Sequence, residues 1–264
     1  MATADLDGTA LTYQVTGTGP RLLFLNGSGG TLVEAAPLLL RLAGRFEVAA
    51  FDQRGIGRSA AASGPYAMAD LAADAAALAD HLGWPSFRVF GISFGGMVAQ
   101  ELAVTRPERI ERMALLCTSS GGPGGSSYPL HTLGELPLEE RQARYAGILD
   151  TRFTAEWLAS RPGDRAVVES MRGRLAAGKP AAVRLGEELQ LRARAAHDVY
   201  DRLPAVTCPT LVAAGRYDGI APVANSEAVA RAIPGAELRV FEGGHIFPFQ
   251  DPEALPAVID FLAR

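Results

Sequence analysis

The stretch Arg88-Val89-Phe90-Gly91-Ile92-Ser93-Phe94-Gly95-Gly96-Met97 decides how the rest of this chain is interpreted. It begins as a short apolar run of strand-forming residues, passes through Gly-x-Ser-x-Gly, and continues into residues 97–103, whose composition favours a helix. This strand, turn and helix are the context in which such a serine is a nucleophile. Glycine fits at Gly91 and Gly95 because strand and helix approach too closely for side chains. Ser93 is therefore predicted to project from a strained turn at a helix N-terminus, where free N–H groups favour negative charge.

Length and composition are those of a globular α/β protein. The chain has 264 residues, of which 48% are hydrophobic and 20% charged, and a net charge of −4. This charge gives no indication of binding to nucleic acid or to an anionic membrane, and no apolar run reaches the roughly 20 residues of a membrane span. The first eight residues lack the features of a signal peptide, so we expect a cytoplasmic protein. The two cysteines, Cys117 and Cys208, are expected to be reduced core residues at opposite ends of the sheet.

Strand and helix patterns alternate along most of the chain, which predicts a mainly parallel sheet covered on both faces. Residues 2–16 are predicted to form a hairpin around the turn signal Asp7-Gly8. Besides the strand and helix around Ser93, the predicted strands are 21–25, 46–51, 109–118, 209–214 and 237–241, and the predicted helices are 32–43, 67–82, 223–232 and one from Pro252.

The alternation is interrupted between two of these strands. Residues 135–200 contain only helix-period segments, which Pro162-Gly163 and Gly178-Lys179-Pro180 separate. We therefore predict a core domain of residues 1–120 and 208–264 and an inserted helical cap of residues 121–207. The Gly-, Ser- and Pro-rich residues 119–127 are predicted to be the most flexible stretch and a hinge for the cap.

A nucleophilic serine needs a base, and the base needs an acid that orients it. His245 directly follows the last predicted strand, so it is expected at the same carboxyl edge of the sheet as Ser93. Asp218 follows strand 209–214 and is expected at that edge too. The order Ser93, Asp218, His245 is one of the known triad orders. The remaining histidines are interpreted as structural or solvated: His81, His131 and His197.

Four motifs, in this order and spacing, resemble the α/β-hydrolase fold serine hydrolases over the whole chain. They are Asp52-Gln53-Arg54-Gly55-Ile56-Gly57-Arg58-Ser59, Gly91-Ile92-Ser93-Phe94-Gly95-Gly96, Gly215-Arg216-Tyr217-Asp218 and Gly244-His245. Within that superfamily, residues 95–100 and 107–110 are similar to 3-oxoadipate enol-lactonases and non-haem haloperoxidase-like esterases. The resemblance implies an α/β fold with a mostly parallel eight-stranded sheet, helices on both faces and an inserted helical cap. It also implies structural roles for Asp52 and Arg54.

The resemblance further implies an oxyanion hole formed by the backbone N–H groups of Ser28 and Phe94. The loop that carries Ser28 reads Asn26-Gly27 where the family usually has His-Gly, and this departure leaves open what Asn26 bonds to. A phosphate-binding glycine loop is a poor alternative because no Gly-Lys-Ser/Thr is present. Phe153 and Trp157 are four residues apart, which predicts that they share one helix face. The candidate residues of the substrate pocket are Asn26, Gly27, Tyr128, Trp157 and Ile246.

These features predict a serine hydrolase that cleaves a small or medium carboxylic ester or lactone through a Ser-His-Asp triad and an acyl-enzyme, with no cofactor and no metal. The cap has nearly balanced charges, so no strongly charged substrate is expected. Three alternatives remain open: a perhydrolase or haloperoxidase-like enzyme, a C–C bond hydrolase with the same triad, and a non-catalytic receptor or signalling partner on the same fold. The expected partner is a small molecule, and neither nucleic acid nor a membrane is expected as a partner. The oligomeric state, including whether the chain forms a homodimer, is left open.

Overall fold

The computed structural model describes residues 1–6 and 8–264. Its centre is an eight-stranded sheet in the order β1-β2-β4-β3-β5-β6-β7-β8. β1 (Ala2–Leu6) and β2 (Thr9–Thr16) form an antiparallel hairpin, β2 is also antiparallel to β4, and the remaining pairs are parallel. The predicted hairpin and mostly parallel sheet are confirmed, whereas Asp7 of the predicted turn lies outside the described residues.

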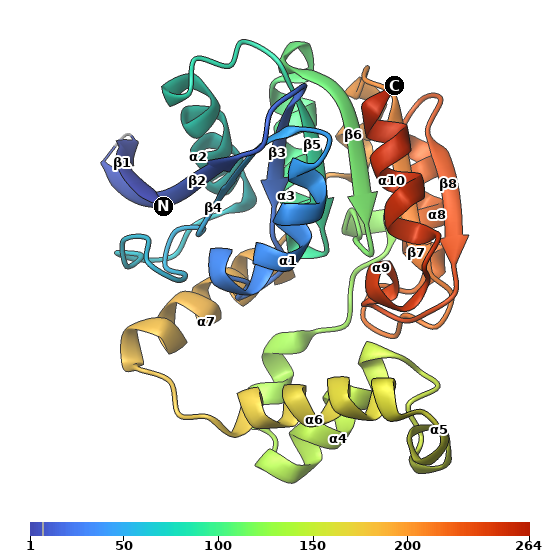
Figure 1. The fold of residues 1–264 in the computed structure, drawn as a ribbon. Coiled ribbons are helices and arrows are strands. Elements are labelled where there is room, and N and C mark those ends of the chain that lie inside the picture. The colour runs from blue at the N-terminus through green and yellow to red at the C-terminus, as the bar shows by residue number, and fades with distance from the viewer. Residues whose placement is uncertain (7) are drawn as a thin grey trace.

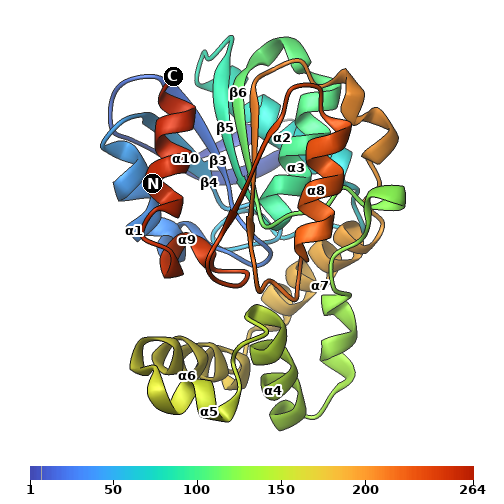
Figure 2. The same ribbon diagram turned by 90° about the vertical axis from the view of Figure 1, so that its right-hand side faces the viewer.

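Helices cover both faces of the sheet (Figure 1 and Figure 2). The parallel strands are β3 (Arg21–Leu25), β4 (Glu47–Phe51), β5 (Phe87–Ile92), β6 (Ile110–Leu116), β7 (Thr210–Gly215) and β8 (Glu237–Phe241). One apolar core joins the sheet to α2 (Met68–His81), α3 (Phe94–Thr105) and α8 (Val223–Ala232). The other joins it to α1 (Leu32–Ala43) and α10 (Ala254–Ala263). Because both faces are covered, the central strands are continuous apolar runs rather than alternating ones.

Between β6 and β7, where every residue is described, the chain forms only helices and loops. Figure 1 shows α4 (Leu138–Leu149), α5 (Ala155–Ser160) and α6 (Pro162–Ala176) as a layer apart from the sheet, and α7 (Ala181–Ala195) leading back toward it. We call α4 to α7 the cap helices. Apolar side chains of α4, α5 and α6 belong to a separate cluster that includes Ala146, Val168 and Met171. Pro162 opens α6 rather than interrupting it, because the first position of a helix needs no N–H donor.

Residues 119–127 pack partly against the rest of the chain, while their predicted flexibility and their predicted role as a hinge stay predictions. Ser119 and Ser120 are buried, and the hydroxyls of Ser119 and Ser127 lie 2.6 Å apart. A side chain at Gly121 would collide with the backbone carbonyl of His197. The glycines here permit close packing, so their presence does not indicate a loose segment.

The prediction that Phe153 and Trp157 share one helix face is wrong. Thr154 is the N-cap of α5, because its hydroxyl accepts a hydrogen bond from the backbone N–H of Trp157 at 3.1 Å. Phe153 therefore lies in the turn before the helix, and only Trp157 lies on α5.

Both cysteines are free and buried, as expected. Cys117 directly follows β6 and Cys208 precedes β7, and these two strands are parallel neighbours, so the thiols lie at opposite ends of the sheet. Across the described part of the chain, none of the helices combines the length and the hydrophobicity needed to cross a bilayer.

Candidate active site

Ser93 lies at a sharp turn between β5 and α3. Its φ of 54° is in the left-handed region, which few residues other than glycine adopt. The turn is fixed from the neighbouring strand, because Ser93 N donates to the Leu116 carbonyl at 2.8 Å and the Thr118 hydroxyl donates to the Ser93 carbonyl at 2.8 Å. A side chain at Gly91 would lie 2.6 Å from the Gly95 carbonyl oxygen, and one at Gly95 would collide with the Leu25 carbonyl. The structure thus agrees with the predicted steric reason for both glycines.

The three residues predicted as a triad form one continuous hydrogen-bonded chain. His245 Nε2 lies 2.8 Å from Ser93 Oγ, and His245 Nδ1 lies 2.8 Å from Asp218 Oδ2. The other oxygen of Asp218 accepts two backbone N–H groups, those of Ile220 and Ala221, each at 2.8 Å. Asp218 is buried, so these bonds satisfy a carboxylate that has little contact with water. Ser93, Asp218 and His245 follow β5, β7 and β8 respectively, which brings them to the carboxyl edge of the parallel sheet.

The end of α4 contacts two loops, the one that carries Asp218, which we call the acid loop, and the one that carries His245, which we call the base loop. Gly219 N donates to the Ile148 carbonyl at 3.0 Å, and His245 N donates to the Leu149 carbonyl at 2.6 Å. A side chain at Gly244 would collide with the Leu149 carbonyl, so glycine is needed beside His245. Two consecutive carbonyls therefore hold the loops that carry Asp218 and His245.

Asp150 extends this contact through side chains. It is fully buried, and both its oxygens accept from Arg152, at 2.9 and 2.7 Å. This pair raises the pKa of Arg152. Gln250 donates to Asp150 Oδ2 at 2.9 Å and accepts from Gly244 N at 2.8 Å. Sequence reasoning missed Asp150 and Gln250, because an acid two residues before an arginine is too common to be a signal.

The loop after β3 lies against Ser93. A side chain at Gly27 would be 3.6 Å from Ser93 Cβ. The side chain of Asn26 turns back into its own loop, since Oδ1 accepts from Gly27 N at 2.9 Å and Nδ2 donates to the Thr31 carbonyl at 3.3 Å. These two hydrogen bonds show what the side chain of Asn26 binds at the position where the family usually has histidine. Among the described residues, no hydrogen bond is formed by the N–H groups of Ser28 or Phe94.

A glutamine from the cap holds the same loop. Gln190 of α7 accepts from Gly29 N at 2.6 Å and donates to Gln53 Oε1 at 2.8 Å. Gln53 in turn donates to the Asn26 carbonyl at 3.2 Å. Gln190 could not be identified from sequence patterns, because this contact joins residues 161 positions apart.

Asp52 and Arg54 hold loops around this edge of the sheet. Asp52 accepts from Leu32 N at 2.7 Å and from Arg58 N at 2.9 Å, which joins the start of α1 to the loop after β4. Arg54 forms a two-bond ion pair with Asp74 of α2, at 2.7 and 2.6 Å. Neither contact involves Ser93, Asp218 or His245, which is consistent with structural roles.

The other predicted pocket residues lie in two places. Trp157 and Ile246 line a cavity of about 590 Å³ together with Arg152, Arg161 and Phe249, and none of the three triad side chains lines it. Tyr128 lies nearer the triad, because its backbone N–H donates to the Ile220 carbonyl in the acid loop at 2.7 Å. A substrate-binding role for Trp157, Ile246 and Tyr128 stays a prediction.

Cys117, Asp218 and His245 bring three atoms of metal-binding type within 4.8 Å of one another. Burial, and then the charge of Asp218, raise the pKa of the Cys117 thiol well above its usual value. A neutral thiol is a poor metal ligand, and both ring nitrogens of His245 already have partners. The chemistry of these donors favours proton transfer from Ser93 over metal binding.

His197 is expected to make the fold sensitive to acid. Burial lowers its pKa to about 4, while the nearby charges of Glu101 and Arg202 act in opposite directions. Between pH 4 and 6.5 the unfolded chain binds this proton and the folded chain does not, so stability falls as the pH decreases. Denaturant unfolding should show a loss of about 2 kcal/mol from this residue between pH 8 and pH 5.

The matched variants for that measurement are His197→Leu and His131→Gln. His131 is exposed, so His131→Gln should keep the pH dependence of the wild type. His197→Leu should flatten it. Equal slopes in the wild type and His197→Leu would contradict the assignment to His197.

A family model and two named relatives match this chain over most of its length. The family model described as alpha/beta hydrolase fold matches residues 20–252. The chain belongs to the α/β-hydrolase fold family. This α/β-hydrolase is 29% identical over 265 residues to 3-oxoadipate enol-lactonase 2 of Acinetobacter baylyi, covering 99% of this chain and 96% of the relative. It is 31% identical over 242 residues to the pimeloyl-[acyl-carrier protein] methyl ester esterase of Xanthomonas oryzae pv. oryzae, covering 89% and 91% of the two chains.

A solved structure shows the same relationship. The enol-lactonase from Burkholderia xenovorans LB400 matches this α/β-hydrolase with a TM-score of 0.82 and 27% sequence identity, covering 100% of both chains. The predicted fold and the predicted resemblance to enol-lactonases are therefore confirmed, and the protein is an enzyme of the α/β-hydrolase family.

Proposed function

We propose that this α/β-hydrolase is a serine hydrolase that cleaves a small or medium carboxylic ester or lactone. Ser93 is the nucleophile, His245 the general base and acid, and Asp218 the residue that orients His245. The observation that carries the proposal is the unbroken chain from Ser93 Oγ through the two ring nitrogens of His245 to Asp218, with 2.8 Å at each step. A nucleophile and base in hydrogen-bond contact, with the base oriented by an acid, is the arrangement that acyl transfer requires.

Acylation follows from the orientation of His245. Asp218 Oδ2 accepts from Nδ1–H, so the lone pair of Nε2 faces Ser93 and takes its proton as Oγ attacks the carbonyl carbon. The carbonyl oxygen becomes an oxyanion, which the N–H groups of Ser28 and Phe94 bind, each contributing about 10²- to 10³-fold in rate. The imidazolium then gives its proton to the leaving alkoxide, and the acyl group stays on Ser93.

Deacylation repeats these steps with water. His245 takes a proton from water, hydroxide attacks the acyl carbon, and the proton returns to Ser93 Oγ as the acid leaves. With a lactone, the alcohol remains attached to the acyl group, so one hydroxy acid is the only product. The named activities of the relatives, a lactonase and a methyl ester esterase, both break a C–O bond beside a carbonyl, which supports this substrate class.

The expected partner is a small-molecule substrate, and we propose a cytoplasmic location. Cys117 and Cys208 are both free, and thiols stay reduced in the cytoplasm.

A fluorophosphonate probe tests the assignment of Ser93. The wild type should gain one phosphonyl group, and peptide mass spectrometry should map it to Ser93. Ser160→Ala, which removes a hydroxyl at the end of α5, should label like the wild type. Labelling elsewhere or none at all would contradict the proposal and favour a receptor on this fold. Parallel assays with water alone, with added peroxide and bromide, and with a C–C bond substrate separate ester hydrolysis from the alternative reactions.

A further inference from the structure

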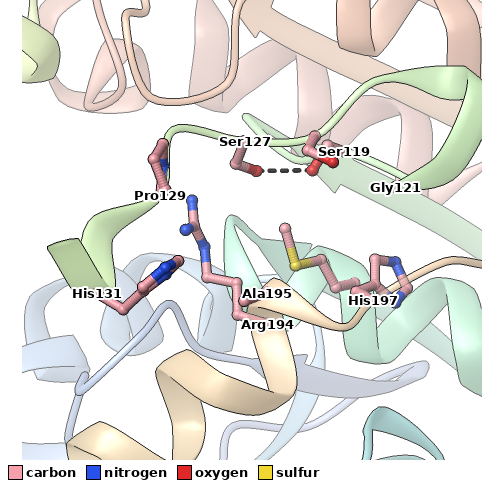
Figure 3. Close-up of a pocket in the computed structure, with 10 residues that line it drawn as sticks. Ser119, Gly121, Ser127, Pro129, His131, Arg194, Ala195 and His197 are labelled. Atoms are coloured by element: carbon pink, nitrogen blue, oxygen red, sulfur yellow. Dashed lines mark hydrogen bonds between the residues drawn. The ribbon is translucent and has the colours of Figure 1, made fainter.

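Arg194 lies buried beside the proposed active site. It is in the last turn of α7 and is only 6% exposed. It lines a cavity of about 100 Å³, and the lining also includes Met97, Ser119, Ser127 and His131. Figure 3 shows the guanidinium directed into the space between Pro129, Ser127 and His131.

One edge of this guanidinium has no partner. Nη1 donates to the Tyr128 carbonyl at 2.7 Å, whereas Nε and Nη2 are buried and form no hydrogen bond within the described residues. Donors that are buried and unpaired are costly, and the cost is larger when the group is charged. A ligand with the right acceptors would remove that cost.

Two other arginines of this chain show which acceptor fits that edge. Arg54 uses Nε and Nη2 to hold both oxygens of Asp74, at 2.7 and 2.6 Å. Arg152 uses the same two atoms to hold Asp150, at 2.9 and 2.7 Å. No carboxylate of the described residues forms an ion pair with Arg194. Its free edge therefore matches a planar carboxylate supplied from outside the chain.

Arg194 keeps its charge at neutral pH. Burial lowers its pKa to about 10, and Tyr145 and Asp218 act in the opposite direction.

Three contacts place the cavity next to the triad. Met97 lies one helical turn after Ser93 on α3. Ser119 follows Thr118, whose hydroxyl holds the Ser93 carbonyl. Tyr128, which accepts from Arg194, also donates through its backbone to Ile220 in the acid loop. The cavity is therefore bordered by α3, which begins directly after Ser93, and by residues 119–129, which are hydrogen-bonded to the turn of Ser93 and to the loop of Asp218, although none of the three triad side chains lines it.

We propose that Arg194 binds a carboxylate of the substrate, so the natural substrate is an ester or lactone that carries a second, free carboxylate. This inference rests on the proposed function, because it assigns the substrate class of the same site. It replaces the expectation that the substrate carries no strong charge, which came from counting charges over the whole cap. Such a count cannot reveal that one arginine is buried without an acid.

Matched pairs of esters test the proposal. The p-nitrophenyl monoesters of succinate, glutarate and adipate carry a terminal carboxylate, and the p-nitrophenyl esters of butyrate, valerate and hexanoate have a methyl group instead. The wild type should prefer the carboxylate member of at least one pair in kcat/KM. Arg194→Gln should lower that ratio by about 10- to 100-fold, the range for a charged hydrogen-bonded contact. Arg194→Lys keeps the charge without the planar fork and should give an intermediate ratio.

Arg192→Gln is the matched control. Arg192 is on the same helix but is 63% exposed and pairs with Glu188, so its replacement should leave the ratio unchanged. Circular dichroism checks that each variant is folded. A wild type without preference for the carboxylate, or an equal loss on both esters in Arg194→Gln and Arg194→Lys, would overturn the proposal.

A binding measurement separates this proposal from the proposed function. Glutarate is titrated by calorimetry into Ser93→Ala and into Ser93→Ala with Arg194→Gln, and the second protein should bind at least about 10-fold more weakly. Absence of ester hydrolysis and of Ser93 labelling would reject the catalytic assignment alone, because the titration still reports on Arg194. Equal glutarate affinity, or no binding to either protein, would reject the carboxylate site while leaving the triad intact.

Discussion

Replacement of Ser93 by alanine is expected to lower kcat by about 10⁶-fold on any ester that the wild type hydrolyses. The hydroxyl is the atom that forms the acyl-enzyme, and its only described side-chain partner is His245 Nε2 at 2.8 Å. In the alanine variant a water molecule would have to attack the carbonyl directly. It would not be positioned as Ser93 Oγ is, and no acyl-enzyme would form. Steady-state rates on a p-nitrophenyl ester, with single-turnover rates for the acylation step, measure the effect.

The fold of this variant should be unchanged, because Ser93 is held through its backbone by Leu116 and Thr118. A thermal unfolding curve compares it with the wild type. Ser160→Ala serves again as the matched control and should keep full activity. Retention of most of the activity in folded Ser93→Ala would refute the role of Ser93.

Replacement of Asp218 by asparagine is expected to lower kcat by about 10⁴-fold. Ile220 N and Ala221 N both donate to Oδ1, so the asparagine carbonyl would keep that position. The new NH₂ group would then face His245 Nδ1, which must become an acceptor. The ring would carry its proton on Nε2, where it points at Ser93, and the base would be lost.

The shape of the pH–rate profile distinguishes this tautomer change from a general loss of structure. Asp218→Asn should regain part of its rate at high pH, where hydroxide can deprotonate Ser93, while its thermal stability stays close to that of the wild type. Asp201→Asn replaces an exposed aspartate and is the control. A loss of less than about 10-fold in folded Asp218→Asn would contradict the orienting role.

The sheet and the position of Ser93, Asp218 and His245 at one of its edges were predictable, because both depend on local patterns and on one rule of topology. The bounds of α1, α8 and β8 agree with the predicted ranges. α1, for example, begins directly after Thr31, and the side chains of Thr31 and Glu34 cap its first turn reciprocally. Ser93, Asp218 and His245 each follow a parallel strand, and parallel strands end at the same edge of a sheet.

The cap side of the site was not predictable, because it depends on contacts between distant residues. Gln190 reaches Gly29, and Asp150 reaches Gln250, across 161 and 100 positions of the chain. Arg194 could not be distinguished from the other arginines of the cap, because burial and missing partners are not visible in a sequence. The close packing of Gly121 against the His197 carbonyl is likewise not visible in the sequence, because it joins distant residues.

The contact of α4 with the acid and base loops has a consequence for protein engineering. Exchange of cap helices between relatives is an obvious way to transfer substrate range. In this enzyme the carbonyls of Ile148 and Leu149 support the loops that carry Asp218 and His245, so a graft that replaces them also disturbs the machinery it is meant to preserve. A chimera that changes residues 155–185 and retains residues 148–150 and Gln190 keeps those supports, and it is the design from which we expect an active hybrid.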